Sequence, residues 1–142
     1  MLEKHLRLTQ KIGLRLPHLL LVGGSAEDRA ALAINLSRLV GATCCMVCSN
    51  EIARPCDMAA HLIELDQNIL FLNEIDKLKP GPQEMLHHAI SEGFVPIILE
   101  EWGKLRNKDI ELTPFTTIAG VASEDLVTET LAGLFQQKLY LF

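Results

Sequence analysis

Residues 23–30 and residues 73–74 are the two places where residue types and spacing could support phosphate chemistry. Residues 23–30 read GGSAEDRA, and Gly23 matches the first glycine of the phosphate-loop motif G-x-x-x-x-G-K-[ST]. Asp28, Arg29 and Ala30 stand where that motif has its second glycine, its lysine and the hydroxyl that contacts magnesium. Together with Gly24, these residues form a vestigial phosphate loop, for which we expect neither ATP nor Mg²⁺ as a cofactor.

The side chains of this loop favour another role for its backbone. A phosphate loop works because backbone N–H groups and the positive end of a helix face an anion. Ser25 and Asp28 have the spacing of a capping box, in which side chains accept hydrogen bonds from those N–H groups. Glu27 and Asp28 add negative charge, and Arg29 is bulkier than lysine. The sequence therefore predicts a self-capped strand-to-helix turn, with nucleotide binding as the alternative.

The apolar run of residues 69–72 ends in Asn73 and Glu74. Four hydrophobic residues and an acidic pair are typical of a Walker B strand, whose Asp lies near magnesium and whose Glu lies near the attacking water. Asn73 takes the Asp position, so its oxygen lacks the charge that holds the metal. Glu74 could orient a water only if nucleotide were bound, and otherwise it ends a strand in a polar pocket.

The hydrophobic pattern alternates strand-like and helix-like segments. Continuous apolar runs, typical of strands buried on both faces, predict strands at residues 19–22, 44–48, 69–72, 115–120 and 138–142. Helical spacing predicts helices at residues 6–16, 27–40, 57–65, 83–91 and 124–134, the last with Ser123 as its N-cap. Residues 94–99 and 110–112 flank a polar turn, residues 102–108, which predicts a β-hairpin. This order predicts an α/β fold around a parallel sheet.

Length and composition fit a single domain. The 142 residues are 49% hydrophobic, which allows one sizeable core and no second full domain. The net charge of −5 argues against a broadly basic surface for nucleic acid or anionic membranes. No apolar run approaches the roughly 18 residues of a membrane span, and the N-terminus lacks a signal-peptide layout. We expect one cytoplasmic domain over residues 1–142.

The cysteines allow a metal site as one hypothesis. Cys45, Cys48 and Cys56 could bind zinc, with His61 as a further ligand. Cys45 and Cys48 fall on a predicted strand, however, where residues three apart face opposite sides. No helix begins there to support redox chemistry. We therefore expect buried, reduced thiols, Cys44 included, and no metal.

Four stretches resemble the large ATPase subdomain of RuvB, the AAA+ motor that drives branch migration of Holliday junctions. They are residues 18–23, 50–60, 69–78 and 112–120. The resemblance runs from about residue 5 to residue 142, and its middle stretches are not catalytic. It implies a three-layer P-loop NTPase fold of the AAA+ type, with a five-stranded parallel sheet flanked by helices and an inserted β-hairpin at about residues 94–112.

Most functional positions of the family, carried over one at a time, have changed. They are Asp28, Arg29 and Ala30 in the phosphate loop, Asn73 in the Walker B strand, and Val121 and Ala122 at the family's sensor threonines. Glu74 is retained, but no arginine follows Arg106 to act as an arginine finger. The lid subdomain and the winged helix have no counterpart in these 142 residues. Because phosphoryl transfer depends on such positioning and electrostatic groups, the changes imply an inactive ATPase.

The hairpin keeps features of a contact surface. In the family it docks the RuvA partner, and here Ile97, Leu99, Trp102 and Arg106 are the candidate partner-binding residues. Trp and Arg are favoured interface anchors. The alternative is that the apolar residues of the hairpin cover the domain's own core.

We therefore expect a RuvB-like pseudo-ATPase that acts as a protein-interaction or regulatory module linked to DNA recombination and repair. Its partner would be itself, a RuvA-like protein or a RuvB-like protein, and the apolar edge of the last strand predicts a homo-oligomer. One alternative is weak ATP or ADP binding, or residual ATPase activity, through Arg29 and Glu74. Another is direct binding of junction DNA, against which the acidic balance and the missing winged helix argue.

Overall fold

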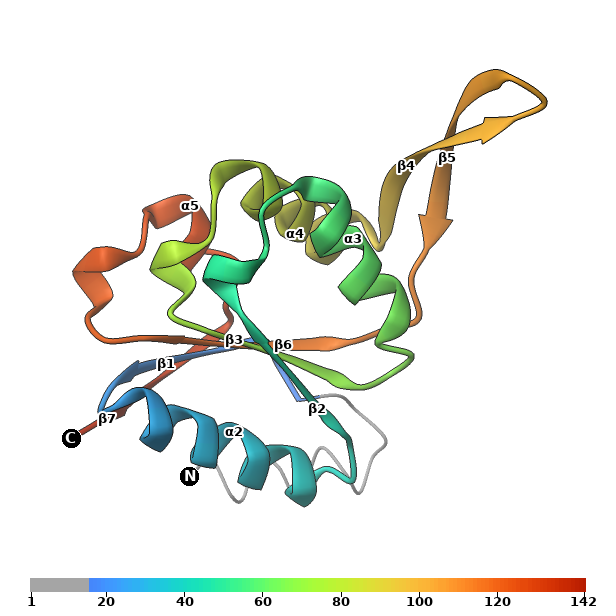
Figure 1. Cartoon of the computed structure of the whole chain (residues 1–142). Helices are drawn as coiled ribbons and strands as arrows, with labels where there is room; N and C mark the ends of the chain where they lie inside the picture. The colour runs from blue at the N-terminus through green and yellow to red at the C-terminus, as the bar shows by residue number, and fades with distance from the viewer. Residues whose placement is uncertain (1–15) are drawn as a thin grey trace.

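The computed structural model describes residues 16–142 of the chain and shows a five-stranded parallel sheet between two layers of helices (Figure 1). The sheet strands are β1 (Leu19–Gly23), β2 (Cys44–Cys48), β3 (Ile69–Asn73), β6 (Thr116–Val121) and β7 (Gln137–Leu141). Their order across the sheet is β2-β3-β6-β1-β7. The predicted α/β fold with five parallel strands is confirmed. The helix predicted at residues 6–16 lies outside the described residues, apart from Leu16.

Strand β1 shows how an apolar run builds the central layer. Its first four residues are buried, because β6 pairs on one side and β7 on the other while helices cover both faces. Leu19 and Leu21 belong to the hydrophobic cluster on the α2 side (α2, Ala26–Leu39), whereas Leu20 and Val22 belong to the opposite cluster. Alternate residues of one strand thus join two separate cores, which is the three-layer arrangement predicted for this fold.

The second helical layer contains α3 (Pro55–Glu64), α4 (Pro80–Glu92) and the short α5 (Glu129–Ala132). The three helices lie on the face of the sheet opposite α2 (Figure 1). Single 3-10 turns precede them: η1 (Ser49–Glu51), η2 (Ile75–Lys77) and η3 (Glu124–Leu126). Among residues 16–142, no helix is long and apolar enough to cross a membrane.

Two predicted helices have other limits in the structure. Helix α4 begins at Pro80 rather than at residue 83, because a proline in the first turn gives up an N–H that has no helical acceptor. The predicted helix 124–134 is wrong: η3 ends before an extended Val127, and Thr128 caps a separate α5 by accepting from Leu131 N–H. Ser123 makes no capping hydrogen bond, since its hydroxyl donates to Asp125 instead.

The hairpin is longer than predicted. Strands β4 (Phe94–Glu101) and β5 (Lys104–Glu111) pair antiparallel along eight residues each, so the polar stretch taken as a turn is mostly strand. The turn is only Trp102 and Gly103, both with positive φ (55° and 74°), the conformation that two-residue hairpin turns favour. The hairpin projects from the body of the domain (Figure 1).

His18, just before β1, contacts the segments at the starts of β6 and β7. Its Nδ1 accepts a hydrogen bond of 2.9 Å from Thr117 N–H, and its ring packs 5.8 Å from the Phe115 ring. Its backbone N–H donates to Gln136 Oε1. Burial lowers the pKa of His18. The ring is therefore neutral, with its proton on Nε2, in the folded domain at neutral pH.

Candidate functional site

The turn after β1 is self-capped, as predicted. The Ser25 side chain accepts from Asp28 N–H at 3.0 Å, and the Asp28 carboxylate accepts from Ser25 N–H at 3.1 Å. The Arg29 N–H donates to Ser25 O. The Asp28 carboxylate thus acts as a cap for α2, while Glu27 is exposed. Two N–H groups at the helix end that could face an anion, those of Ser25 and Asp28, are thus paired with side chains, and the Arg29 N–H makes the first regular hydrogen bond of α2.

Arg29 is folded into the space beside this loop. Only 3% of the residue is exposed, although arginine is rarely buried without a charged partner. Its Nη1 donates to Gly23 O at 2.9 Å and to Gly24 O at 3.0 Å, and its Nε donates to Asn73 Oδ1 at 2.9 Å. The next residue, Ala30, is half-buried and packs on the α2-side cluster. The residue at the lysine position is thus bound by the loop itself.

Asn73 and Glu74, at the end of β3, are also engaged within the domain. Asn73 Oδ1 accepts from Arg29 Nε and Glu74 N–H, and Asn73 Nδ2 donates to Ala26 O at 2.9 Å. Glu74 has a left-handed backbone (φ 54°), and its carboxylate pairs with Lys77 Nζ at 2.9 Å. The structure therefore brings the two predicted motifs together and joins them through Arg29 and Asn73.

Two glycines make room for this arrangement. A Cβ at Gly120 in β6 would lie 2.6 Å from Asn73 Oδ1 and 3.0 Å from Arg29 Cδ, so the arginine stem runs directly over its backbone. A Cβ at Gly23, where φ is +94°, would lie 2.5 Å from Leu141 O in β7. Sequence reasoning missed Gly120, because nothing in its local sequence reveals the side chains that cross it.

The residues at the sensor positions have no polar role. Val121 is fully buried and pairs with Val22 in the register of β6 and β1. Ala122 is exposed after the end of the strand. Neither side chain carries a hydrogen-bonding group.

The hairpin has two chemically different faces, because directly paired residues of an antiparallel pair share a face. The face that contains Val95 is the inner face, and the other is the outer face. The inner face carries Ile97, Leu99, Glu101, Lys104, Arg106, Lys108 and Ile110 besides Val95. The outer face carries Phe94, Pro96, Ile98, Glu100, Leu105, Asn107, Asp109 and Glu111. All three cations of the hairpin lie on the inner face, whereas three of its four carboxylates, Glu100, Asp109 and Glu111, lie on the outer face.

Exposure differs between the candidate partner-binding residues. Ile97 and Leu99, on the inner face, are half-buried, and Ile97 packs against the core of the domain. Trp102 is 98% exposed at the tip, and Arg106 is exposed with its Nη1 3.6 Å from the Glu101 carboxylate. Leu105 and Ile98 on the outer face are 77% and 68% exposed, and neither is among the partner-binding residues predicted from the sequence. Once the turn is placed at Trp102–Gly103, the alternation of side chains along each strand shows which residues lie on which face.

The cysteines differ from the prediction in part. Cys44 and Cys45 are half-buried in β2, and burial raises the pKa of the Cys44 thiol. Cys48 and Cys56 are exposed, so their predicted burial is wrong: β2 is an edge strand, and Cys56 lies in the first turn of α3. Within residues 16–142, no cluster of His, Cys, Asp and Glu could hold a metal ion.

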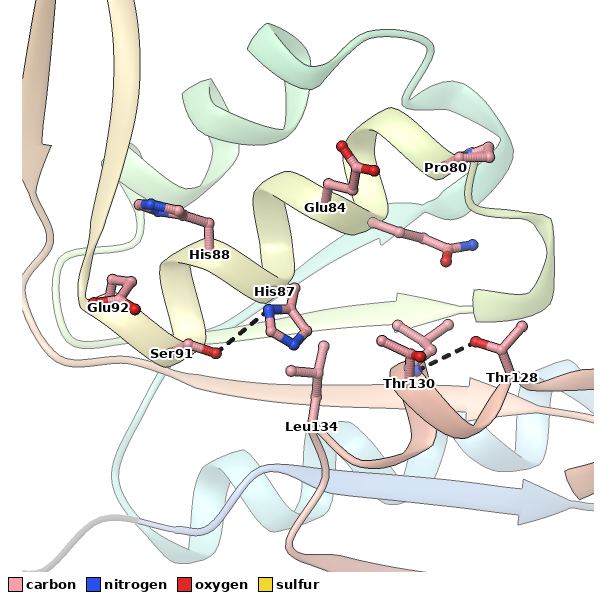
Figure 2. A pocket seen from close by; sticks show the side chains of 11 residues that line it. Pro80, Glu84, His87, His88, Ser91, Glu92, Thr128, Thr130 and Leu134 are labelled. Atoms are coloured by element: carbon pink, nitrogen blue, oxygen red, sulfur yellow. Dashed lines mark hydrogen bonds between the residues drawn. The ribbon is translucent and has the colours of Figure 1, made fainter.

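A pocket of about 580 Å³ lies between α4 and α5, and Figure 2 shows its side chains. Leu131 and Leu134 contribute apolar surface, and the Ser91 hydroxyl lies 3.4 Å from His87 Nδ1. The remaining lining residues are Pro80, Gln83, Glu84, His88, Glu92, Thr128 and Thr130. The lining has glutamates but no Lys or Arg, which does not suit a polyphosphate. None of the predicted site residues lines it.

The fold and the turn after β1 define the class of the protein: an α/β domain of the P-loop NTPase type with an additional β-hairpin. Residues 2–141 match the family described as the Holliday junction DNA helicase RuvB P-loop domain. The chain belongs to this family.

Solved structures agree with this assignment. A point mutant of RuvB from Thermotoga maritima superposes with a TM-score of 0.87 and 25% identity, covering 99% of this chain and 44% of RuvB. A structure described as the Thermotoga maritima RuvB Holliday junction branch migration motor gives 0.79 and 24%, covering 98% and 43%. NtrX from Brucella abortus with ADP shares the fold alone, at 0.66 and 15%, covering 99% and 35%. The chain thus spans less than half the length of the RuvB structures it matches.

Proposed function

We propose that this chain is a RuvB-like pseudo-ATPase, with degenerate Walker A and Walker B motifs, that acts in the cytoplasm through protein contacts in DNA recombination or repair. The position of Arg29 carries the proposal. Its guanidinium lies among Gly23 O, Gly24 O and Asn73 Oδ1, the space next to the turn in which a phosphate loop would hold its anion. A nucleotide could enter only by displacing these hydrogen bonds.

The surroundings of Asn73 also support the proposal, because they do not suit a magnesium ion. Mg²⁺ in NTPase sites is bound through one or two carboxylates together with substrate phosphates. Asn73 supplies no charge, and both of its amide atoms are hydrogen-bonded within the domain. Glu74 is paired with Lys77. The remaining groups therefore favour a structural role over magnesium binding.

Calorimetry of the wild-type chain with Mg-ATP and Mg-ADP tests this proposal. A ligand at 100 times its Kd would stabilise the native state by about 2.7 kcal/mol, a rise in Tm of roughly 8 °C for a domain of this size. We expect no rise above about 1 °C, with an intact RuvB as the positive control. A saturable rise that disappears in Arg29→Ala would instead support weak nucleotide binding, and turnover of ATP would support residual activity.

We assign partner binding to the hairpin. Trp102, Ile98 and Leu105 are large apolar side chains exposed on a projecting element, the kind of surface that protein interfaces use. Titration calorimetry with purified RuvA-like and RuvB-like proteins tests this role. We expect Trp102→Ala and Leu105→Ser to weaken binding at least tenfold, whereas Leu39→Ser, an exposed leucine on α2, leaves it unchanged. Equal affinities for all three variants would exclude the hairpin as the docking surface.

Strand β7 is the second proposed contact, between copies of this chain. Among the described strands it pairs only with β1, and Tyr140 is 50% exposed beside this edge. An unpaired edge can pair with another chain. We expect light scattering to show a dimer or larger oligomer, and Tyr140→Lys to shift it toward the monomer. A monomer at high concentration would contradict this contact.

One observation favours a second candidate function. Lys104, Arg106 and Lys108 share the inner face of the hairpin, so this face could contact DNA phosphates. Binding to four-way junction DNA that weakens steeply with added salt, together with a lower affinity and a shallower salt dependence in Arg106→Ser, would support direct DNA binding.

A further inference from the structure

The peptide groups of residues 23–25 have the wrong polarity for an anion. A phosphate site aims several backbone N–H groups at its centre. Here Gly23 and Gly24 aim their carbonyl oxygens at the Arg29 guanidinium, while Ser25 N–H and Asp28 N–H bind side chains of the capping box. The loop therefore presents two carbonyl acceptors to the Arg29 guanidinium.

Asn73 adds a third acceptor from β3. Its Oδ1 faces Arg29 Nε, and its orientation is fixed because Nδ2 donates to Ala26 O on the helix side of the loop. The acceptors thus come from the loop beside Arg29 and from Asn73, which is 44 positions from Arg29 in sequence. Together they contact one planar cation.

The guanidinium has no carboxylate partner among these acceptors. Within residues 16–142, no ion pair involves Arg29, although the residue is 97% buried. Burying a charge is costly unless hydrogen bonds compensate for lost water. The three acceptors, Gly23 O, Gly24 O and Asn73 Oδ1, supply that compensation. The bare backbone of Gly120 leaves space for the stem of the arginine.

We infer that Gly23, Gly24 and Asn73 form a cation cage, and that the Arg29 guanidinium is its resident ligand. The inference deepens the proposed function, on which it rests for the view that the site holds no nucleotide. It adds that the loop has exchanged its ligand class: the site is built for a planar guanidinium cation and not for phosphate. Arg29 then connects β1, β3 and α2 as a bound ligand would, without any nucleotide.

Chemical rescue tests the cage. Arg29→Ala removes the guanidinium and leaves three acceptors facing a cavity, so we expect its Tm to fall by about 8 °C or more. Methylguanidinium at about 10 mM, far below the molar range in which guanidinium denatures proteins, should raise that Tm in a saturable way. Sodium chloride at equal ionic strength and inorganic phosphate should not. Arg38→Ala, an exposed arginine of the same helix, is the matched control and should show no rescue.

The outcomes separate the cage from the proposed function. Stabilisation of Arg29→Ala by inorganic phosphate or Mg-ATP, without an effect of methylguanidinium, overturns the cage even if the wild type binds no nucleotide. Binding of Mg-ATP by the wild type overturns the proposed function itself. If Arg29→Ala does not fold, Arg29→Lys serves instead: its smaller cation leaves space, so a rise in Tm with methylguanidinium supports the cage and a rise with phosphate overturns it.

Discussion

The turn after β1 and the β4–β5 hairpin use their polar and apolar groups in opposite ways. At the turn, Arg29 and Asn73 are hydrogen-bonded within the domain, and the arginine is almost fully buried. On the hairpin, Trp102 and Leu105 extend into solvent. The comparison teaches that the side chains at the phosphate-loop position are bound within the domain, whereas those at the tip of the hairpin contact solvent.

The largest effect is expected where the turn is most crowded. Gly120→Ala would set a Cβ 2.6 Å from Asn73 Oδ1 and 3.0 Å from Arg29 Cδ. Overpacking of about 1–3 kcal/mol and a disturbed hydrogen bond of about 1 kcal/mol give a loss of about 3 kcal/mol in the free energy of unfolding. Urea unfolding followed by circular dichroism measures it. A loss below about 0.5 kcal/mol would contradict the close packing of these three residues.

Substitution of a hairpin glycine should destabilise the protein less than Gly120→Ala and should affect only the hairpin. Gly103 has φ +74° with no atom near its Cβ position, so Gly103→Ala adds only backbone strain of about 1 kcal/mol. Hydrogen exchange should show about fivefold faster opening of β4 and β5, with α2 unchanged. Equal acceleration in both regions would show that the hairpin and the body unfold together.

The pH dependence of stability tests the body of the domain at the start of β1, the opposite end of this strand from the turn. Because burial lowers the folded-state pKa of His18, the unfolded chain binds more protons below its ordinary pKa of about 6.5. Stability is therefore complete above about pH 6.5 and is lost as the pH falls through the window below it. His18→Asn keeps an acceptor for Thr117 N–H but does not titrate, so its Tm should fall less between pH 7 and 5. The exposed His87, changed to Gln, is the control, and a loss of the pH dependence in that variant would refute the assignment to His18.

The smallest effect on stability belongs to the outer face of the hairpin. Leu105 is 77% exposed, so Leu105→Ser should change the free energy of unfolding by less than about 0.5 kcal/mol. Urea unfolding of this variant, measured together with its partner binding, shows whether weaker binding comes from a lost contact or from a less stable fold. A larger destabilisation would mean that Leu105 packs within the domain.

The parts of the molecule differ in how far sequence could predict them. The parallel strands and the capping box of Ser25 and Asp28 follow from local patterns, and both are confirmed. The burial of Arg29 depends on Asn73 and Gly120, which the fold brings to it from distant positions, and no local pattern carries that information. The exposure of Leu105 depends on where a two-residue turn sets the strand register, which one misplaced residue would invert.

The exposure of Trp102 has a spectroscopic consequence. It is the chain's one tryptophan, and it is 98% exposed in the folded protein. Its indole is already solvated, so its emission should resemble that of a tryptophan in water and change little when the two cores unfold. The same fluorophore should shift to shorter wavelength when a partner covers the tip of the hairpin. The indole thus provides an intrinsic optical signal with which to test the proposed docking, and this signal should change little on denaturation.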